Sequence, residues 1–186
     1  MLKKILVICF LVSLAGCGGN SGVYHDKNMD FGSIHTVAIL PIQSLQGGGA
    51  SGEMLRDDLM NSLLATGAIY VIPSGEVAHG IIVSNMQNPT MPTVEQLKAF
   101  CKAEKTDAVI TGVIKEFGAV HEGAASADTI AVNLQMIEGQ TGKVIWSASA
   151  SLGGVTVLDR LFGGGAQPMN TITQKAVNDL IKKLFM

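Results

Sequence analysis

The spacing of hydrophobic positions changes part-way along the chain. Between residues 34 and 105, short apolar runs are separated by stretches in which apolar residues recur every three or four positions. From residue 108 to residue 152, apolar and small or polar residues alternate instead. The first spacing is typical of helices and the second of strands with one covered face. The pattern therefore predicts a first half that mixes strands and helices, and a second half that is rich in strands.

The first half is predicted to open with a buried strand, Thr36 to Leu40, which ends near Pro41. A helix follows from Gly52 to Thr66, with Ser51 as its cap and Gly67 as its end. The other elements expected in this half are a strand at 68–72, a helix at 74–85 capped by Ser74, and a helix at 93–105 with a capping box of Thr93 and Gln96.

The second half is predicted to form three strands, a hairpin turn and a final helix. The strands are expected at 108–117, 129–137 and 143–152, the turn at 138–142, a loop at 153–168 and the helix at 171–185. The order of elements is thus β-α-β-α-α-β-β-β-α. We predict a single α/β (α+β) domain with one mixed sheet, parallel in its β-α-β first half and an antiparallel meander in its second half, with helices packed on the sheet.

The N-terminus has the three parts of an export signal. Lys3 and Lys4 precede an apolar run from Ile5 to Leu14, which is too short to span a bilayer. The run ends in Leu14–Cys17, with the sequence LAGC, which resembles the lipobox of bacterial lipoproteins. That resemblance implies cleavage before Cys17 and acylation of its sulfur. An ordinary secretory signal and a buried N-terminal helix are the alternatives.

This interpretation divides the chain into three parts. Residues 1–16 form the signal peptide, residues 17–33 the lipidated cysteine and a glycine-rich tether, and residues 34–186 the folded domain. Two or more acyl chains hold a protein firmly at a membrane, whereas one binds only marginally. Gly18 stands where lipoproteins kept at the inner membrane tend to have Asp. The resemblance therefore favours an outer-membrane anchor with the domain facing the periplasm.

Charge and cysteine content narrow the possible partners. The chain has 13 basic and 15 acidic residues, and losing Lys3 and Lys4 with the signal leaves 11 basic residues against 15 acidic ones. A nucleic-acid partner would require a concentrated basic face, so we expect none. Cys9 leaves with the signal and Cys17 carries lipid, so Cys101 has no partner for an intrachain disulfide.

No set of residues indicates catalysis. Gly47, Gly49 and Gly52 match the spacing of a dinucleotide fingerprint, but the glycines stand several residues after the strand and no acid follows at the position that would hold a ribose. We interpret them as a loop, and a nucleotide-binding envelope enzyme is the less favoured alternative. The four histidines lack the spacing of metal ligands. We predict a protein that is not an enzyme, with no cofactor, no metal and no small-molecule substrate.

One segment is a candidate contact with a protein partner. Asp159, Arg160, Leu161 and Phe162 place two apolar side chains beside a charge pair, just before the glycines of residues 163–165. Apolar residues exposed in a loop often mark an interaction surface. The alternative is that Leu161 and Phe162 pack under the sheet.

Four segments of the second half carry a resemblance to the CsgG/LpoB-like outer-membrane lipoproteins, whose domain is similar to the N-terminal domain of TolB. They are residues 107–112 (DAVITG), 130–134 (IAVNL), 141–143 (TGK) and 144–147 (VIWS). The resemblance implies a lipoprotein that binds envelope proteins, with self-association among the options, and that assists envelope assembly or secretion. The alternative is a subunit of a CsgG-type secretion channel for curli-like export. Segments 116–128 and 153–168 are short for the membrane hairpins of such a channel, because each membrane strand needs roughly 9–11 residues.

Overall fold

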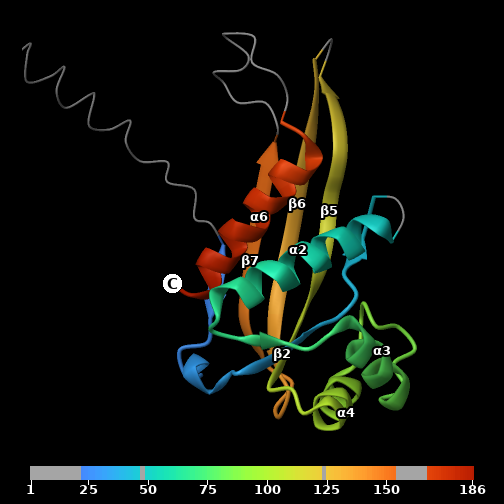
Figure 1. Cartoon of the computed structure of the whole chain (residues 1–186), viewed down its shortest axis with the longest axis vertical. Helices are drawn as coiled ribbons and strands as arrows, with labels where there is room; N and C mark the ends of the chain where they lie inside the picture. Colours follow the sequence, from blue (N-terminus) through green and yellow to red (C-terminus); the bar gives the residue numbers. More distant parts are fainter. Residues whose placement is uncertain (1–21, 47–48, 123–124, 154–166) are drawn as a thin grey trace, which may run out of the picture.

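The computed structural model describes residues 22–46, 49–122, 125–153 and 167–186 (Figure 1). Its parallel strands come from the first half of the chain. β2 (Thr36–Ile39) lies between β4 (Tyr70–Val71) and β5 (Ala108–Glu122) and is parallel to both. β3 (Gln43–Ser44) continues along the same side of β5, next to Val113 and Ile114.

The remaining strands are antiparallel. β6 (Ala125–Glu138) pairs with β5 on one side and with β7 (Val144–Gly153) on the other, and β1 (Val23–His25) adds to the outer side of β7. The strand order is β1-β7-β6-β5-β2-β4, with β3 paired to β5. One mixed sheet with a parallel first part and an antiparallel second part is therefore present, which confirms the predicted fold class.

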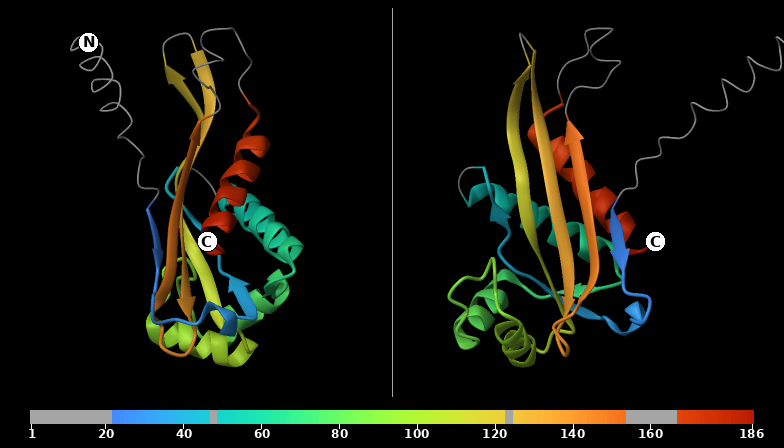
Figure 2. Two further views of the ribbon diagram at one scale, coloured as in Figure 1. Left: turned by 90° about the vertical axis from the view of Figure 1, so that its left-hand side faces the viewer. Right: turned by 180° about the vertical axis from the view of Figure 1, so that it is seen from behind.

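The helices cover the two faces of the sheet unequally. α2 (Ala50–Thr66) and α6 (Met169–Leu184) lie side by side on one face, as Figure 2 shows in its side view. α3 (Ser74–Val83) and α4 (Val94–Glu104) pack on the opposite face, at the end of the sheet where the parallel strands lie. Above these two helices, none of the described helices lies over the rear face of β5, β6 and β7 in the view from behind (Figure 2).

This arrangement creates two hydrophobic cores, one on each face. Alternation along β2 directs Val37 and Ile39 into the larger core under α2 and α6, whereas Ala38 and Leu40 enter the smaller core under α3 and α4. Trp146 is the largest fully buried side chain of the larger core. Its indole N–H donates to the carbonyl of Lys183 in α6 (3.1 Å), which ties the last helix to β7. No helix in the described ranges is both long and apolar enough to cross a membrane.

The helix ends follow the predictions in part. Thr93 and Gln96 form the expected capping box before α4, and Gly67 adopts the left-handed conformation at the end of α2 (φ 66°). The predicted serine caps are wrong. α2 begins at Ala50 after Gly49, so Ser51 lies inside its first turn and its hydroxyl donates to the hydroxyl of Ser44 (3.0 Å). α3 has Pro73 at its cap position, and Ser74 is its first residue.

Four strands differ from the expected pattern, and one of them, β3, has no counterpart among the predicted elements. β1 lies within residues 17–33, the segment interpreted as a tether, and is held by pairing Val23 with Ala148. β5 and β6 extend past the predicted boundaries, to Glu122 and from Ala125, and form one antiparallel ladder with a single register shift between Ile114 and Glu116. The long β5–β6 hairpin therefore projects beyond α2 at the top of Figure 1.

Candidate functional site: open strand edges

The projecting part of the sheet has an open edge along β5. β3 covers β5 only at Val113 and Ile114, so residues 115–122 have no strand on their outer side within the described parts of the chain. The register shifts between Ile114 and Glu116, which makes Lys115 the extra residue of a β-bulge. Lys115 and Glu116 are exposed at this bulge. Bulges and charges are features that blunt an edge strand against unwanted pairing.

The opposite edge of the sheet is open along β7. β1 pairs with Trp146, Ser147 and Ala148 only, so residues 149–153 have no strand on their outer side among the residues that the structure describes. The carbonyl of Ser149 accepts a hydrogen bond from Nζ of Lys183 (2.8 Å). Among the described residues, the part of this edge that neither a strand nor a side chain covers is therefore Ala150–Gly153, which carries no charged residue.

Lys183 supports this edge from α6. Its side chain is 8% exposed, and its ammonium group also contacts the carboxylate of Asp179 (2.6 Å), one turn earlier in the helix. A buried ammonium group is unfavourable unless it is paired and hydrogen-bonded, and both conditions are met here. The contact ties the C-terminal end of α6 to β7 at Ser149.

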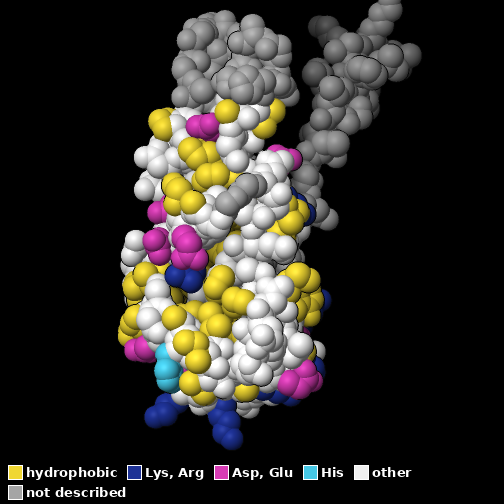
Figure 3. All heavy atoms as spheres, turned by 90° about the vertical axis from the view of Figure 1, so that its right-hand side faces the viewer, with side chains coloured by type: hydrophobic (Ala, Val, Ile, Leu, Met, Phe, Trp, Pro, Cys, Tyr) yellow, Lys and Arg dark blue, Asp and Glu magenta, His cyan; other side chains and the backbone are white. Residues whose placement is uncertain are grey.

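The side of the molecule formed by β5, α3 and α4 mixes apolar and polar residues. Figure 3 shows hydrophobic side chains in small groups between polar atoms along this side, with Lys or Arg at the lower end. α4, whose sequence includes Lys98 and Lys102, lies at that end of the molecule (Figure 1). Leu45, Ile82 and Met91, in segments on this side, are each more than 60% exposed. Such groups next to a strand edge suit contact with another protein surface.

Open edges can accept another polypeptide strand. The unpaired N–H and C=O groups of an edge are a template for main-chain hydrogen bonds with an added strand. The two open edges here lie on opposite sides of one sheet and have different sequences. They can therefore be joined edge to edge between copies of the same chain, with the β7 edge of one copy against the β5 edge of the next.

The two sites predicted from the sequence, Cys17 and the segment Asp159–Phe162, lie outside the described residues. Asp159, Arg160, Leu161 and Phe162 belong to the connection between β7 and α6. That connection starts where the open edge of β7 ends, at Gly153. Neither open edge could be predicted from the sequence, because β1 and β3, whose short lengths leave the edges open, are too short to show a period.

The glycines of the dinucleotide-like motif have structural roles where they are described. Gly49 precedes α2 at its cap position. A Cβ added at Gly52 would lie 2.4 Å from the carbonyl oxygen of Ile42, so the helix packs directly on the chain that follows β2. Close packing of backbone explains Gly52 without a bound phosphate.

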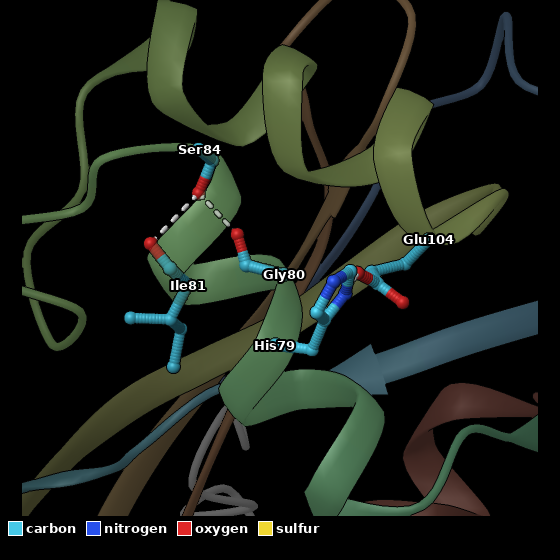
Figure 4. Close-up of polar contacts among 5 residues, drawn as sticks. All are labelled: His79, Gly80, Ile81, Ser84 and Glu104. Carbon is cyan, nitrogen blue, oxygen red and sulfur yellow. Dashed lines mark hydrogen bonds and ion pairs between the residues drawn. The ribbon is translucent and has the colours of Figure 1, made fainter.

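The titratable side chains singled out in the sequence are dispersed. A ring nitrogen of His25 lies 3.3 Å from the carbonyl oxygen of Leu184, and His79 pairs with the largely buried carboxylate of Glu104 at 2.8 Å (Figure 4). Cys101 is buried, and this burial raises the pKa of its thiol. Within the described ranges, no three His, Cys, Asp or Glu side chains gather in a way that could hold a metal ion.

The fold occurs in known structures, although no family model and no curated protein sequence matches the chain. A PelC dodecamer from Paraburkholderia phytofirmans aligns with a TM-score of 0.60 at 14% identity, over 88% of this chain and 96% of that one. Lipoprotein GNA1162 from Neisseria meningitidis aligns with a TM-score of 0.52 at 19% identity, over 80% and 99%. The LpoB C-terminal domain from Escherichia coli aligns at 12% identity over 77% and 93%, but its TM-score of 0.48 is too low to support an argument. The first two likenesses show a shared fold.

Proposed function

We propose that the chain is a lipid-anchored outer-membrane lipoprotein whose periplasm-facing domain, which is not an enzyme, binds envelope proteins and further copies of itself in envelope assembly or secretion. The observation that carries the proposal is the pair of open edges on opposite sides of one sheet, along residues 115–122 and 150–153. Protein partners are the ligands that such edges accept.

The two edges favour a directional contact between copies. Joining the β7 edge of one copy to the β5 edge of another uses two different surfaces, which is a heterologous contact. Such contacts generate rings when the rotation closes. The related fold of PelC occurs as a dodecamer, which supports assembly as a property that this fold permits.

The anchoring part of the proposal rests on the N-terminal sequence. The apolar run and the LAGC segment ending at Cys17 have the form of a lipoprotein signal. GNA1162, which shares the fold, is itself a lipoprotein. The acyl chains of Cys17 would hold the domain at the membrane, and residues 18–21 would link it to β1.

A secretion channel is less well supported than a binding domain. Phe117 and Ile130 are the last pair of the β5–β6 hairpin that contributes to the larger core. The part of the hairpin beyond this pair consists of residues 118–122 and 125–129. Each of these segments is shorter than the roughly 9–11 residues that a membrane strand requires.

The test compares two lysine substitutions on the same face of β7 in the full-length acylated protein. Ser151→Lys adds a charge where the outer edge is open, whereas Ser147→Lys adds the same charge where β1 already covers that edge. We expect the mass of the purified assembly, measured by light scattering after size-exclusion chromatography in detergent, to fall for Ser151→Lys only. Equal masses for both variants and the wild type would show that this edge is not the contact.

The anchor is tested separately. Metabolic labelling with a fatty acid should mark the wild type and leave a Cys17→Ala variant unlabelled, and fractionation should place the wild type in outer membranes. In vivo crosslinking on the same cells should then capture envelope proteins or further copies. A labelled protein that crosslinks to nothing would contradict the binding role while leaving the anchor intact.

A further inference from the structure

A small polar pocket lies on the rear face of the sheet, where the helical cover ends. Its volume is about 190 Å³. Its side chains come from three adjacent strands and from the connection between α3 and α4. The residues whose side chains line it include Gln43, Thr90, Met91, Thr111, Asn133 and Gln135.

The strand register brings the polar floor of the pocket together. Thr111 of β5 lies opposite Gln135 of β6, and Val113 lies opposite both Asn133 of β6 and Gln43 of β3. Asn133 and Gln135 are two positions apart, so they share one face of β6. Three strands that are distant in sequence thus place three amides and a hydroxyl around one cavity.

The hydroxyl of Thr111 has no partner. The residue is 3% exposed, and its Oγ1 makes no hydrogen bond to any described residue. Buried polar groups in proteins are nearly always hydrogen-bonded, because burying one without a partner is unfavourable. Thr111 also lines the pocket, so a molecule bound there is the candidate partner once the side chain turns its hydroxyl toward the cavity.

The three amides also have unused hydrogen-bonding capacity. Gln43, Asn133 and Gln135 are partly buried, and none of their side chains makes a hydrogen bond within the described part of the chain. Each amide offers both a donor group and an acceptor oxygen. The lining contains no charged residue. The pocket is therefore suited to a neutral ligand that can donate and accept at several adjacent positions.

The outer wall of the pocket is held in place. Thr90 and Met91 belong to the connection between α3 and α4. At the start of this connection, the hydroxyl of Ser84 donates a hydrogen bond to the carbonyl of Gly80 (2.6 Å; Figure 4). Nε2 of Gln96 in α4 donates to the carbonyl of Asn85 (2.8 Å). The connection is also pinned by Met86, which is buried in the smaller core. A wall that is fixed before binding lowers the cost of ordering the site.

We propose that this pocket binds one neutral, hexose-sized sugar unit. Sugar hydroxyls donate and accept hydrogen bonds at adjacent ring positions, which matches the Thr111 hydroxyl and the three amides. The thioether side chain of Met91 supplies an apolar contact for the C–H face of the ring. An anion or cation would find no opposite charge in the lining, and a peptide strand would pair with the open edges of the sheet instead of binding in a small pocket on its face.

The test measures binding to the full acylated chain in lipid nanodiscs by saturation-transfer NMR and titration. The probes are glucose, galactose, N-acetylglucosamine and N-acetylgalactosamine, with glucuronate as a charged comparison. We expect millimolar or tighter binding of at least one neutral sugar and at least tenfold weaker binding of glucuronate. The pairs of probes with and without an N-acetyl group distinguish a plain hexose from an amino-sugar unit.

Two variants locate the site. Thr111→Val keeps the shape of the side chain and removes the hydroxyl, and Asn133→Ala removes one amide. We expect each to weaken sugar binding at least tenfold, while Ser147→Ala, on the same face outside the pocket, leaves binding unchanged. A melting temperature of Thr111→Val equal to or above that of the wild type would show that the loss of binding is not caused by unfolding.

Three results would overturn the proposal. The first is no saturation transfer to any neutral sugar, which would mean that water alone fills the pocket. The second is undiminished binding in both Thr111→Val and Asn133→Ala. The third is a change of assembly mass in Thr111→Val without any sugar binding, which would assign the pocket to a protein contact. The sugar site does not depend on the open edges, so the Ser151→Lys experiment can fail independently.

Discussion

The contact between α3 and α4 gives a quantitative test, because it depends on a missing side chain. A Cβ added at Gly80 would lie 2.6 Å from Cε2 of Phe100 and 2.6 Å from Cγ of Glu104. Phe100 is fully buried, and Glu104 is held by His79 at 2.8 Å (Figure 4). Neither neighbour can withdraw without disturbing the smaller core. Gly80→Ala must therefore push the two helices apart or distort them.

The size of the effect follows from two opposing contributions. Alanine in a helix interior is favoured over glycine by about 1 kcal/mol. Overpacking of a well-packed core costs about 1–3 kcal/mol. The difference leaves a loss of up to about 2 kcal/mol in the free energy of unfolding for Gly80→Ala, and we expect the upper end because the clash involves a buried ring. At this chain length each kcal/mol shifts the melting temperature by roughly 2–4 °C.

A matched control lies in the same helix. Gly75 is exposed in the first turn of α3, and an added Cβ there would meet nothing within 4 Å. Gly75→Ala should stabilise the protein by about 0.4–1 kcal/mol through the unfolded state. Urea unfolding of both variants measures the difference in their free energies of unfolding, which we expect to be up to about 3 kcal/mol with Gly75→Ala the more stable. Equal stabilisation by the two substitutions would refute the close approach of α3 and α4.

Three further predictions concern other parts of the fold. Trp146→Phe removes the indole donor to the Lys183 carbonyl and leaves that carbonyl unpaired, so urea unfolding should show a loss of about 1–3 kcal/mol. Thr93→Ala breaks the capping box with Gln96 and should cost about 1 kcal/mol in the same assay. Burial raises the pKa of the Cys101 thiol, so the folded state keeps this proton when the unfolded state loses it. Stability relative to Cys101→Ala should be constant below the ordinary thiol pKa of about 8.5 and decrease above it, and a rise would contradict the burial.

The strongly periodic segments could be predicted from the sequence, and the short ones could not. The last helix was expected at 171–185 and is found at Met169–Leu184, because its apolar face repeats over four turns. β1 and β3 contain three and two residues, too few to show a period. They form because β7 and β5 offer edges that they can join. The extension of β5 past Phe117 likewise depends on its ladder with β6, since Gly118 and Ala119 have low strand propensity.

The candidate site was harder to predict than the fold. The functional residues chosen from the sequence, Cys17 and Asp159–Phe162, rest on local patterns, and they stay predictions. The polar pocket could not be found in this way, because Gln43, Thr111 and Asn133 are distant in sequence and only the strand register unites them. One signal was present. Asn133 and Gln135 occupy alternate positions of one strand and therefore share a face, and both side chains are polar and uncharged. Such a face can have a role other than contact with solvent.

The position of β1 links the proposed anchor to the proposed assembly. Val23 pairs with Ala148, immediately before the open part of β7 at residues 150–153. Cys17 stands six residues before Val23, so even a fully extended chain reaches only about 20 Å from this pair. An acylated Cys17 would therefore hold the β7 edge close to the membrane surface. Confinement to a surface raises the effective concentration of neighbouring copies, as a short linker does for joined modules. The open part of this edge is only a few residues long, so the contact between copies should be weak without the anchor. Anchoring should therefore strengthen assembly. We expect the Cys17→Ala variant to require higher protein concentrations for assembly than the acylated chain.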